Sequence, residues 1–470
     1  MTAAIDMYIA HMSSRIIMAE TRLHIRAISF FLKLTTLYGT ACAFVNTFLR
    51  LLLKLTQKRQ DLEDGKAKSS ITNANGGKKM NYLKEALAEE AYTTEMYQRF
   101  HRFPEPSRHE VKTHRMIREA LNAENIPFLT PAENITIAVV RGAKPGRVVG
   151  IRADTDALQV TEETELPYKS ENPGLMHACG HDAHIAIGLT CAKLLSRAAA
   201  ELCGTVKVIF QPAEEGEFGA QAVLETGLVN DVNAFFGVHV WSPYRSGELR
   251  VSERGVAAST DMFTITIHGL GGHGAMPELC VDTVVCASEL VCALQTIASR
   301  FTSPFDPVVV TVGSLHAGTR CNIIAGEAVL EGTIRTFDPR VYAQVHERFD
   351  RLVRDVCDAH GCAYEVDMRP ACGVTWNDEK LVRLARANAE KIAPGETGDD
   401  KPSMLGDDFG EYRAVAPVCY MKVGIRNEAL QATYAHHNPR FRVDPAALPR
   451  AVAWLAMNAE SYLNESARGE

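Results

Sequence analysis

The sequence predicts an α/β fold, in which a mixed sheet with helices on both faces carries an inserted α+β satellite domain. Apolar runs of strand length alternate with segments whose apolar residues recur at helical spacing, which is typical of a sheet covered by helices. Between residues 259 and 370 the order changes to β-α-β-β-α-β, the ferredoxin-like arrangement. A chain of 470 residues with 46% apolar and 23% charged residues is sufficient for two or three globular domains.

The sheet domain is predicted to begin at residue 80 and to run to residue 258. Its first helix is amphipathic and spans 83–100, and a second helix, 185–195, starts directly after a histidine-rich segment. Its strands are five β-rich runs: 134–141, 148–151, 206–210, 234–240 and 249–251. Because polar motifs follow strands, we expect a site at the carboxyl ends of the strands.

The satellite domain is predicted over residues 259–370. Its elements, in order, are a strand at 262–268, a helix at 281–299, strands at 307–315 and 328–334, a helix at 340–359 and a strand at 363–366. Residues 371–470 then return to the sheet domain, and an apolar-periodic helix over 445–463 closes the chain.

The first 79 residues differ from the rest. The stretch 27–55 is apolar, but its longest uncharged run, Leu34 to Leu49, has 16 residues, fewer than the roughly 20 that a membrane-spanning helix needs. A polar segment typical of a linker or of disorder follows, up to Lys79. Three interpretations compete: an amphipathic membrane anchor, a disordered extension, or a translation start assigned too far upstream. We favour the last, with Met80 as the start, which predicts no peptides from residues 1–79 in the native protein.

Charge and cysteine content indicate partners and compartment. A formal net charge of -7 and the absence of a basic patch with interleaved aromatic residues argue against nucleic acid. The twelve cysteines are irregularly spaced in a large chain, which is typical of reduced thiols rather than a disulfide framework. We therefore expect a cytoplasmic location and no membrane partner for the folded core.

The segment from Met176 to His184 is the densest cluster of candidate metal ligands. It reads Met-His-Ala-Cys-Gly-His-Asp-Ala-His and so contains one cysteine, three histidines and one aspartate. Thiolate, imidazole and carboxylate are the side chains that bind divalent transition metals. Cys179 and His181 are two positions apart, so both can face one point in an extended or turn segment. Taken alone, the cluster also fits a polar loop with a buried cysteine.

Three further segments carry residues of the same chemical type. Glu214 and Glu215 follow a β-rich run, and adjacent carboxylates at a strand end repel each other unless a cation or a shared proton relieves them. One of the two can bind a metal while the other acts as general base. His239 lies in an apolar strand, where a histidine is more often a core residue than a ligand. His436 and His437 directly precede an Asn-Pro pair, which indicates a loop.

Taken together, these motifs resemble those of the M20 metallopeptidase family, in the branch of hippurate hydrolases, N-acyl-amino-acid deacetylases and plant auxin-conjugate hydrolases. The resemblance runs from about Met80 to the C-terminus. The matching segments are 152–158 (RADTDAL), 177–182 (HACGHD), 211–216 (QPAEEG), 237–239 (GVH), 271–277 (GGHGAMP), 322–324 (NII), 332–335 (GTIR) and 437–439 (HNP). Asp407 stands where glutamate is commoner in the family, which bears on substrate fit rather than on catalysis.

The resemblance implies a centre of two divalent metal ions. Its ligands would be the five residues that match the ligand positions of the family: Cys179, His181, Glu215, His239 and His437. His437 rather than His436 matches, because it directly precedes the Asn-Pro pair. Glu214 falls on the general acid/base of the family, and Asp156 on an acidic residue that orients ligands from behind the metals. A mixed sulfur, nitrogen and oxygen set accepts Mn²⁺ or Zn²⁺, and also Co²⁺ or Ni²⁺.

The resemblance also implies roles in the satellite domain. It makes His273 a donor to the oxyanion that reaches the active site of a neighbouring subunit, and it implies a homodimer formed through residues 259–370. Asn322 and Arg335 match positions that hold the carboxylate of the substrate, and an arginine fork suits a carboxylate. These two residues are 13 positions apart, and we expect them at neighbouring strand ends. Without the family match, His273 would be interpreted as a turn histidine and Arg335 as a surface arginine.

The implied function is hydrolysis of the amide bond of N-acyl amino acids, such as acetyl or benzoyl conjugates, to a carboxylic acid and a free amino acid. A dipeptidase or carboxypeptidase of the same superfamily is the alternative among enzymes. The cysteine of the metal motif favours the amidohydrolase branch, because peptidase branches more often supply aspartate there. A catalytically inactive binding protein is the alternative from another class, and the intact Glu214 and ligand set argue against it.

Overall fold

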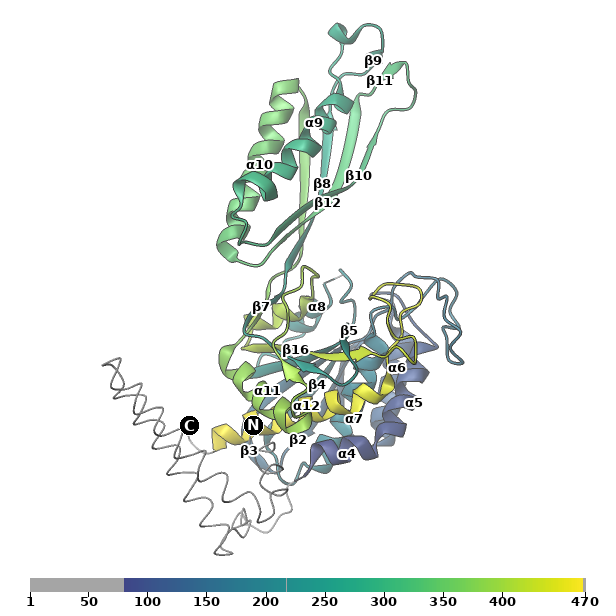
Figure 1. Cartoon of the computed structure of the whole chain (residues 1–470), viewed down its shortest axis with the longest axis vertical. Coiled ribbons are helices and arrows are strands. Elements are labelled where there is room, and N and C mark those ends of the chain that lie inside the picture. Colours follow the sequence, from purple (N-terminus) through teal and green to yellow (C-terminus); the bar gives the residue numbers. More distant parts are fainter. Residues whose placement is uncertain (1–79, 217, 468–470) are drawn as a thin grey trace, which may run out of the picture. The chain divides into compact units, whose positions relative to one another are not determined.

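An eight-stranded mixed sheet with the order β1-β2-β4-β3-β5-β16-β6-β15 organises most of the chain (Figure 1). The computed structural model describes residues 80–216 and 218–467, so the interpretations of residues 1–79 lie outside the described part. The strands are β1 (Phe128–Ala132), β2 (Ile135–Arg141), β3 (Lys144–Asp154), β4 (Cys203–Gln211), β5 (Ala234–Arg245), β6 (Leu249–Arg250), β15 (Thr397–Gly398) and β16 (Val418–Arg426). The predicted mixed α/β class is therefore confirmed.

Strands β4, β3, β5 and β16 are parallel neighbours at the centre of this sheet. Buried parallel strands are apolar on both faces, which is why their sequences are nearly continuous runs of valine, isoleucine and phenylalanine. Alternate residues of the antiparallel neighbour β2 enter different cores, since Ala138 and Val140 face one side and Ile137 and Val139 the other.

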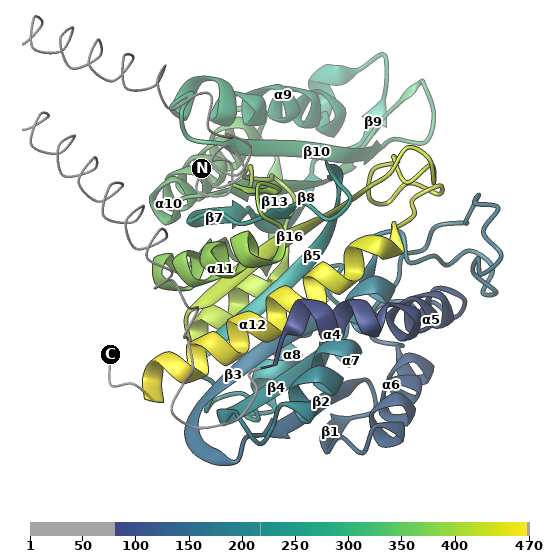
Figure 2. The same ribbon diagram turned by 60° about the horizontal axis from the view of Figure 1, so that its bottom comes forward.

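Helices cover both faces of the large sheet, as predicted. The helices that share a core with Ala138 and Val140 are α4 (Tyr82–Ala88), α5 (Glu90–His101), α6 (Val111–Ala123), α7 (His181–Arg197), α11 (Glu379–Ile392) and α12 (Leu448–Ala467). Figure 2 shows α12 running along this face beside α4. On the other face lie α8 (Gly219–Glu225) and the 3-10 helix η3 (Asp408–Ala414).

In the sheet domain one expected helix differs in the structure, and one strand was not predicted. The first helix is interrupted at Glu89, so it forms α4 and α5 rather than one continuous helix. Strand β16 was not expected, although it lies in the middle of the sheet. Its sequence has no period-2 alternation, and it contains Lys422 and Gly424, which weaken a strand pattern.

The elements between Ser259 and Cys372 follow the order β-α-β-β-α-β and form a second, four-stranded antiparallel sheet, β10-β12-β8-β13. They are β8 (Ser259–His268), α9 (Thr283–Thr296), β10 (Val308–Ala317), β12 (Glu327–Thr336), α10 (Pro339–His360) and β13 (Ala363–Cys372). The sheet and its two helices share a separate core that contains Phe263, Leu290 and Phe349. The domain boundaries at residues 258/259 and 370/371 stay predictions.

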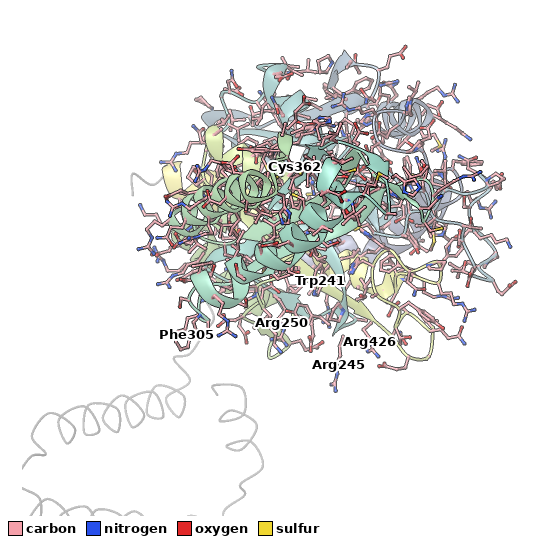
Figure 3. The ribbon with its side chains drawn as sticks, turned by 90° about the horizontal axis from the view of Figure 1, so that it is seen from above. Trp241, Arg245, Arg250, Phe305, Cys362 and Arg426 are labelled. Carbon is pink, nitrogen blue, oxygen red and sulfur yellow. The ribbon has the colours of Figure 1, made fainter. Side chains whose placement is uncertain are left out.

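Short elements complete both parts of the structure. Strand β7 (Arg254–Ala257) pairs with β14 (Thr375–Asn377), and β9 (Gly272–His273) pairs with β11 (Ile323–Ile324). The short helices are η1 (Pro277–Leu279), the π-helical η2 (Ile297–Phe301) and η4 (Pro445–Ala447). Figure 3 shows Phe305, beyond η2, projecting from the molecule, where it is 92% exposed.

Helix α9 and its continuation η2 span Thr283–Phe301 and would be long and apolar enough to cross a membrane by length and composition alone. This helix packs in the satellite core, where Leu290 and Leu294 are fully buried. Val284 and Val285, at its beginning, are exposed. A core helix passes the same test, so this one candidate among residues 80–216 and 218–467 is weak evidence for a membrane span.

A buried charged cluster ties α5 to the beginning of α7. His101 Nδ1 lies 2.6 Å from Asp182 Oδ2, and its Nε2 lies 3.2 Å from Glu162 Oε1. All three side chains are at most 4% exposed. Burial opposes the charged imidazolium, but the hydrogen bonds to Asp182 and Glu162 outweigh it and raise the pKa of His101 to about 9.

We expect the contribution of His101 to stability to decrease with pH. Its folded pKa, about 9, lies above its unfolded value, so the contribution is complete below about pH 6.5 and disappears as the pH rises through 9. The shift corresponds to about 3 kcal/mol. Urea unfolding of metal-free wild type and His101→Gln at several pH values measures this contribution. A stability difference that does not shrink between about pH 6 and 9.5 would contradict the expectation.

Candidate active site

The cysteine and histidine of the densest motif lie where a tight turn enters helix α7. Gly180 has a φ of 94°, and a Cβ atom there would collide with the side chain of Val240 on β5. Glycine therefore permits this close approach, after which α7 begins at His181. The turn brings Cys179 and His181 next to His239 of β5, whose Nε2 lies 3.5 Å from the Cys179 sulfur.

The structure brings the five predicted metal ligands together in two overlapping triplets. Cys179, His181 and His239 form one triplet, and Cys179, Glu215 and His437 form the other. Within each triplet the ligand atoms lie within 4.8 Å of one another. Cys179 belongs to both, which is the arrangement that two neighbouring cations sharing one thiolate would need. The role of these residues as ligands stays a prediction.

Two of the histidines are oriented as metal ligands usually are. His181 Nδ1 lies 2.9 Å from the carbonyl oxygen of Asp156, and His239 Nδ1 is hydrogen-bonded to the carbonyl of Val240. A carbonyl only accepts, so Nδ1 carries the proton in both rings. Nε2 is then the nitrogen left to bind a cation, which would displace any proton that it carries.

Buried groups of this site lack hydrogen-bond partners among the described residues. They are His181 Nε2 and Glu215 Oε1, although His437 Nε2 lies 3.3 Å from that oxygen without hydrogen-bond alignment. Despite burial, the charges of Asp154 and Asp156 raise the pKa of His181 to about 10. The site thus favours positive charge and offers sulfur, nitrogen and oxygen donors, a set that fits divalent transition metals.

The geometry distinguishes His437 from His436. Both ring nitrogens of His436 have protein partners, since Nε2 lies 2.9 Å from the carbonyl of Val240 and Nδ1 lies 3.3 Å from Ser242 Oγ. The side chain of His437 is 51% exposed and faces Glu215. A histidine with both nitrogens engaged has no free lone pair, which favours His437 as the ligand.

Asp156 lies directly behind the ligands, at the position expected for an orienting residue. Its Oδ1 lies 3.1 Å from His181 Nδ1, and its Oδ2 accepts hydrogen bonds from Ser107 Oγ at 2.7 Å and from the backbone N–H of Glu215 at 3.1 Å. The carboxylate is buried, so these contacts restrain both His181 and the loop that carries Glu215.

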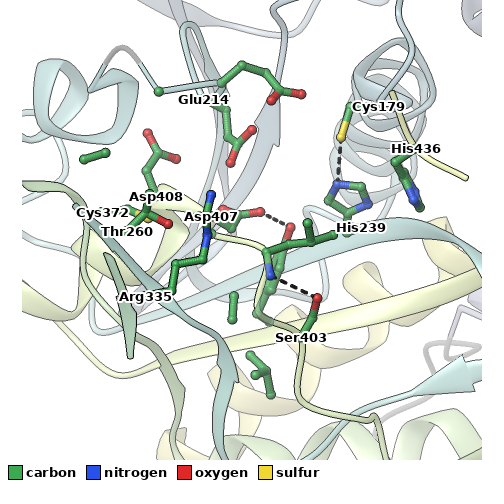
Figure 4. A pocket seen from close by; sticks show the side chains of 18 of the residues that line it. Cys179, Glu214, His239, Thr260, Arg335, Cys372, Ser403, Asp407, Asp408 and His436 are labelled. Carbon is green, nitrogen blue, oxygen red and sulfur yellow. Dashed lines mark hydrogen bonds between the residues drawn. The ribbon is translucent and has the colours of Figure 1, made fainter. Parts of the chain in front are cut away.

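Glu214 lies beside both triplets, and Figure 4 shows its carboxylate at the same pocket as Cys179 and His239. Its Oε2 is 3.8 Å from His181 Nε2. Burial, followed by the charges of Asp407 and Glu215, raises the pKa of Glu214 well above its ordinary value. A carboxyl group with a raised pKa is suited to proton transfer near neutral pH.

Sequence reasoning missed a buried ionic network beneath the site. Arg152 is 2% exposed and forms ion pairs with Asp154, with Asp407 at 3.2 Å and with Asp408 at 2.9 Å. Tyr420 donates a hydrogen bond to Asp407. Arg152 and Asp154 stand in the RADTDAL motif, so part of the signal was present. No local pattern indicates that Asp407 and Asp408, which are 255 and 256 residues from Arg152, join them.

A pocket of about 270 Å³ opens over these groups. Its walls include Trp241, Tyr420 and Lys422, and it also contains Thr260 and Arg335 from paired ends of β8 and β12. Arg335 donates one hydrogen bond to Thr333 Oγ1 at 2.8 Å. The structure therefore places this predicted substrate-binding arginine in the same pocket as Glu214 (Figure 4).

Asn322 and His273 lie elsewhere, and the expectation that Asn322 and Arg335 share neighbouring strand ends is wrong. Arg335 is near the end of β12, whereas Asn322 precedes β11, beyond the Glu327 end of that strand. The length of β12 separates the two ends by roughly 25 Å. β11 pairs with β9, which carries the exposed His273, and Figure 1 shows both at the tip of the second sheet. The number of residues between Asn322 and Arg335 does not reveal that they lie at opposite ends of β12.

Comparison with known proteins identifies the family. The model of peptidase family M20/M25/M40 matches residues 150–461. An N-acetylcysteine deacetylase of Bacillus subtilis (strain 168) is 36% identical over 375 residues, which are 79% of this chain and 97% of the relative. Thermostable carboxypeptidase 1 of Saccharolobus solfataricus is 33% identical over 381 residues, which are 80% of this chain and 96% of the relative.

Solved structures agree with this match. The crystal structure of the Bacillus subtilis YXEP protein, described as a dinuclear metal binding peptidase from the M20 family, superposes with a TM-score of 0.71 at 33% identity. The superposition covers 80% of this chain and 99% of that protein. The chain therefore belongs to peptidase family M20/M25/M40, which confirms the family and the hydrolase class that its motifs predicted.

Proposed function

We propose that this protein hydrolyses the amide bond of N-acyl amino acids at a centre of two divalent metal ions. The observation that carries the proposal is the pair of ligand triplets that share Cys179, with Glu214 beside them in the pocket that also contains Arg335. The deacetylase relative and the dinuclear structural relative support the same reaction class. The ligand set accepts Mn²⁺ or Zn²⁺, and also Co²⁺ or Ni²⁺.

The five ligands of the proposed centre are Cys179, His181, Glu215, His239 and His437. The chemistry that two divalent cations supply when bound is positive charge, which lowers the pKa of a water molecule and polarises a carbonyl oxygen. Asp156 and the carbonyl of Val240 hold the His181 and His239 rings with Nε2 directed into the site. The two histidine rings are therefore already oriented for binding before a metal ion arrives.

Glu214 is the proposed general acid/base. Its carboxylate takes a proton from the attacking water and then delivers it to the nitrogen of the departing amino acid. The position of Glu214 supports this role, because its carboxylate lies beside both triplets, with Oε2 3.8 Å from His181 Nε2. Arg335, whose guanidinium donates a hydrogen bond to Thr333 Oγ1, is the proposed partner of the substrate carboxylate.

A homodimer through the satellite domain is proposed, because His273 and Asn322 lie outside the pocket of their own chain. Several apolar side chains close to them in sequence are exposed: Leu270, Met276, Leu279, Val284, Val285 and Ile323. Exposed apolar side chains that gather into a patch are typical of a protein interface. In the proposed dimer, His273 would donate to the oxyanion in the partner's pocket and Asn322 would contact the substrate there.

A cytoplasmic location is proposed from the cysteine chemistry. All eleven cysteines of the described residues are free, including Cys286 and Cys357, whose sulfur atoms lie 4.0 Å apart in the satellite core. Thiols this close remain reduced most readily in a reducing compartment.

A carboxypeptidase activity is the alternative, and the 33% identity to thermostable carboxypeptidase 1 favours it specifically. Both activities need a free carboxylate on the substrate, so the presence of Arg335 in the pocket does not distinguish one activity from the other. A test that does is hydrolysis of hippurate and N-acetyl amino acids against unblocked dipeptides and blocked peptides, with and without Mn²⁺ or Zn²⁺. Faster hydrolysis of peptides than of any simple N-acyl amino acid would replace the proposal with the alternative.

Glu214→Gln should retain both metals and lose most turnover, because an amide cannot accept the proton. Removal of a general base typically lowers the rate by about 10²–10⁴-fold. Metal analysis and kcat of the purified variant measure the two effects separately. A variant with nearly wild-type kcat would contradict the role of Glu214.

His273→Ala should fold and bind both metals but turn over slowly, since loss of one oxyanion donor costs about 10²–10³-fold in kcat. Mixing this variant with Glu214→Gln tests whether His273 acts across the dimer. Each mixed dimer would contain one pocket with an intact Glu214 and a His273 from the partner, so partial activity should return. If subunits demonstrably exchange and no activity returns, His273 does not act in the partner's pocket.

A further inference from the structure

Glu214 belongs to a short loop with an unusual backbone conformation. The preceding residue, Ala213, has a φ of 54°, in the left-handed region that non-glycine residues rarely occupy. Ala213 is buried, and its carbonyl accepts a hydrogen bond from the backbone N–H of Gly219 at 3.1 Å. A strained conformation of this kind persists only where the surroundings hold it.

A carboxylate from a distant part of the chain holds this loop on one side of Glu214. Glu110 Oε1 accepts a hydrogen bond from the backbone N–H of Ala213 at 2.7 Å. On the other side, Asp156 Oδ2 accepts the backbone N–H of Glu215 at 3.1 Å. The backbone N–H groups of Ala213 and Glu215, on either side of Glu214, are therefore both bound by side chains from outside the loop.

The environment of Glu110 indicates that its side chain serves this loop. Glu110 is fully buried at the beginning of α6, yet its side chain does not cap that helix. Glu105 does so instead, by accepting the backbone N–H groups of Lys112 and Thr113. The second oxygen of Glu110 accepts a hydrogen bond from Asn134 Nδ2 at 3.3 Å, which orients the carboxylate toward Ala213.

We propose that Glu110 is a positioning residue for Glu214: by holding the Ala213 N–H, it keeps the strained loop in the conformation that directs Glu214 to the reacting amide. Glu110 does not contact the pocket and acts only through the loop. The proposal rests on the proposed role of Glu214 as general base. It requires an acceptor at the Glu110 position, and not a negative charge.

The test compares kcat, KM and metal content of wild type, Glu110→Ala, Glu110→Gln and Glu110→Asp on an N-acetyl amino acid. Glu110→Ala should lower kcat by about 10- to 100-fold, as a small misplacement of a catalytic group does, with both metals bound and KM little changed. Glu110→Gln keeps an oxygen at the same reach and should recover most of kcat. Glu110→Asp keeps the charge, but its shorter side chain withdraws the oxygen, so its kcat should lie below that of Glu110→Gln.

Glu105→Ala is the matched control, because it removes carboxylate–backbone hydrogen bonds from the same helix without affecting Ala213. It should lower the melting temperature and leave kcat per bound metal unchanged. Placing Glu110→Ala on the Glu214→Gln background should cause no further loss of kcat, because both changes remove the same function.

Several results would overturn the proposal. They are an unchanged kcat in Glu110→Ala, loss of metal from that variant, an additive effect on the Glu214→Gln background, or a higher kcat for Glu110→Asp than for Glu110→Gln. The last comparison decides the matter if Glu110→Ala does not fold. If Glu214→Gln is inactive while the Glu110 variants are normal, only this inference fails. If wild type hydrolyses no N-acyl amino acid, the proposed function fails and this inference with it.

Discussion

Negative charge gathered in a small buried volume is the constraint on which the rest of the site depends. Asp154, Asp156, Asp407 and Asp408 are each at most 5% exposed, and Glu214 and Glu215 lie beside them. Arg152 compensates three of these carboxylates. Burying unpaired charge is costly, so the remaining carboxylates need a further source of positive charge. Burial and the charges of Asp407 and Glu215 raise the pKa of Glu214, and the charges of Asp154 and Asp156 raise the pKa of His181.

The fold creates this concentration because parallel strands end at one edge. β3 ends at Asp154, β4 ends at Gln211 directly before the glutamate loop, and β5 contributes His239. Helix α7 begins at His181 and completes the set. Residues that are far apart in sequence thus converge without any long flexible side chain, and the supporting hydrogen bonds come from buried groups. Such preorganisation is what a hydrolytic site requires.

The four-stranded sheet reaches the pocket at one of its ends. Thr260 and Arg335 are paired across β8 and β12 at that end, and His273 and Asn322 lie toward the other. One chain therefore brings Arg335, but neither His273 nor Asn322, to its own pocket. The proposed two-chain site would reconcile this separation with the family motifs.

Features of the fold and the site could be predicted from the sequence where neighbouring residues specify them, and could not where they arise from tertiary contacts. The α/β class, the element order β-α-β-β-α-β and the family follow from periodicity and from short motifs. Through the family resemblance, the same motifs predict that Cys179, His181, Glu215, His239 and His437 converge. β16 was missed because Lys422 and Gly424 interrupt its apolar run. Glu110 and the partnership of Arg152 with Asp407 and Asp408 were missed because they arise from tertiary contacts. The error over Asn322 and Arg335 has the same cause, since sequence separation does not reveal which end of a strand a residue occupies.

Metal stoichiometry of single-ligand variants tests the central claim most directly. The two triplets share only Cys179, so wild type should bind two divalent ions per chain and Cys179→Ala should lose both. His239→Ala and His437→Ala, which each change one triplet, should each chiefly lose one ion. Elemental analysis after dialysis against a defined Mn²⁺ or Zn²⁺ buffer measures these numbers. Two ions retained by Cys179→Ala, or an equal loss in all three variants, would contradict a centre built on a shared thiolate.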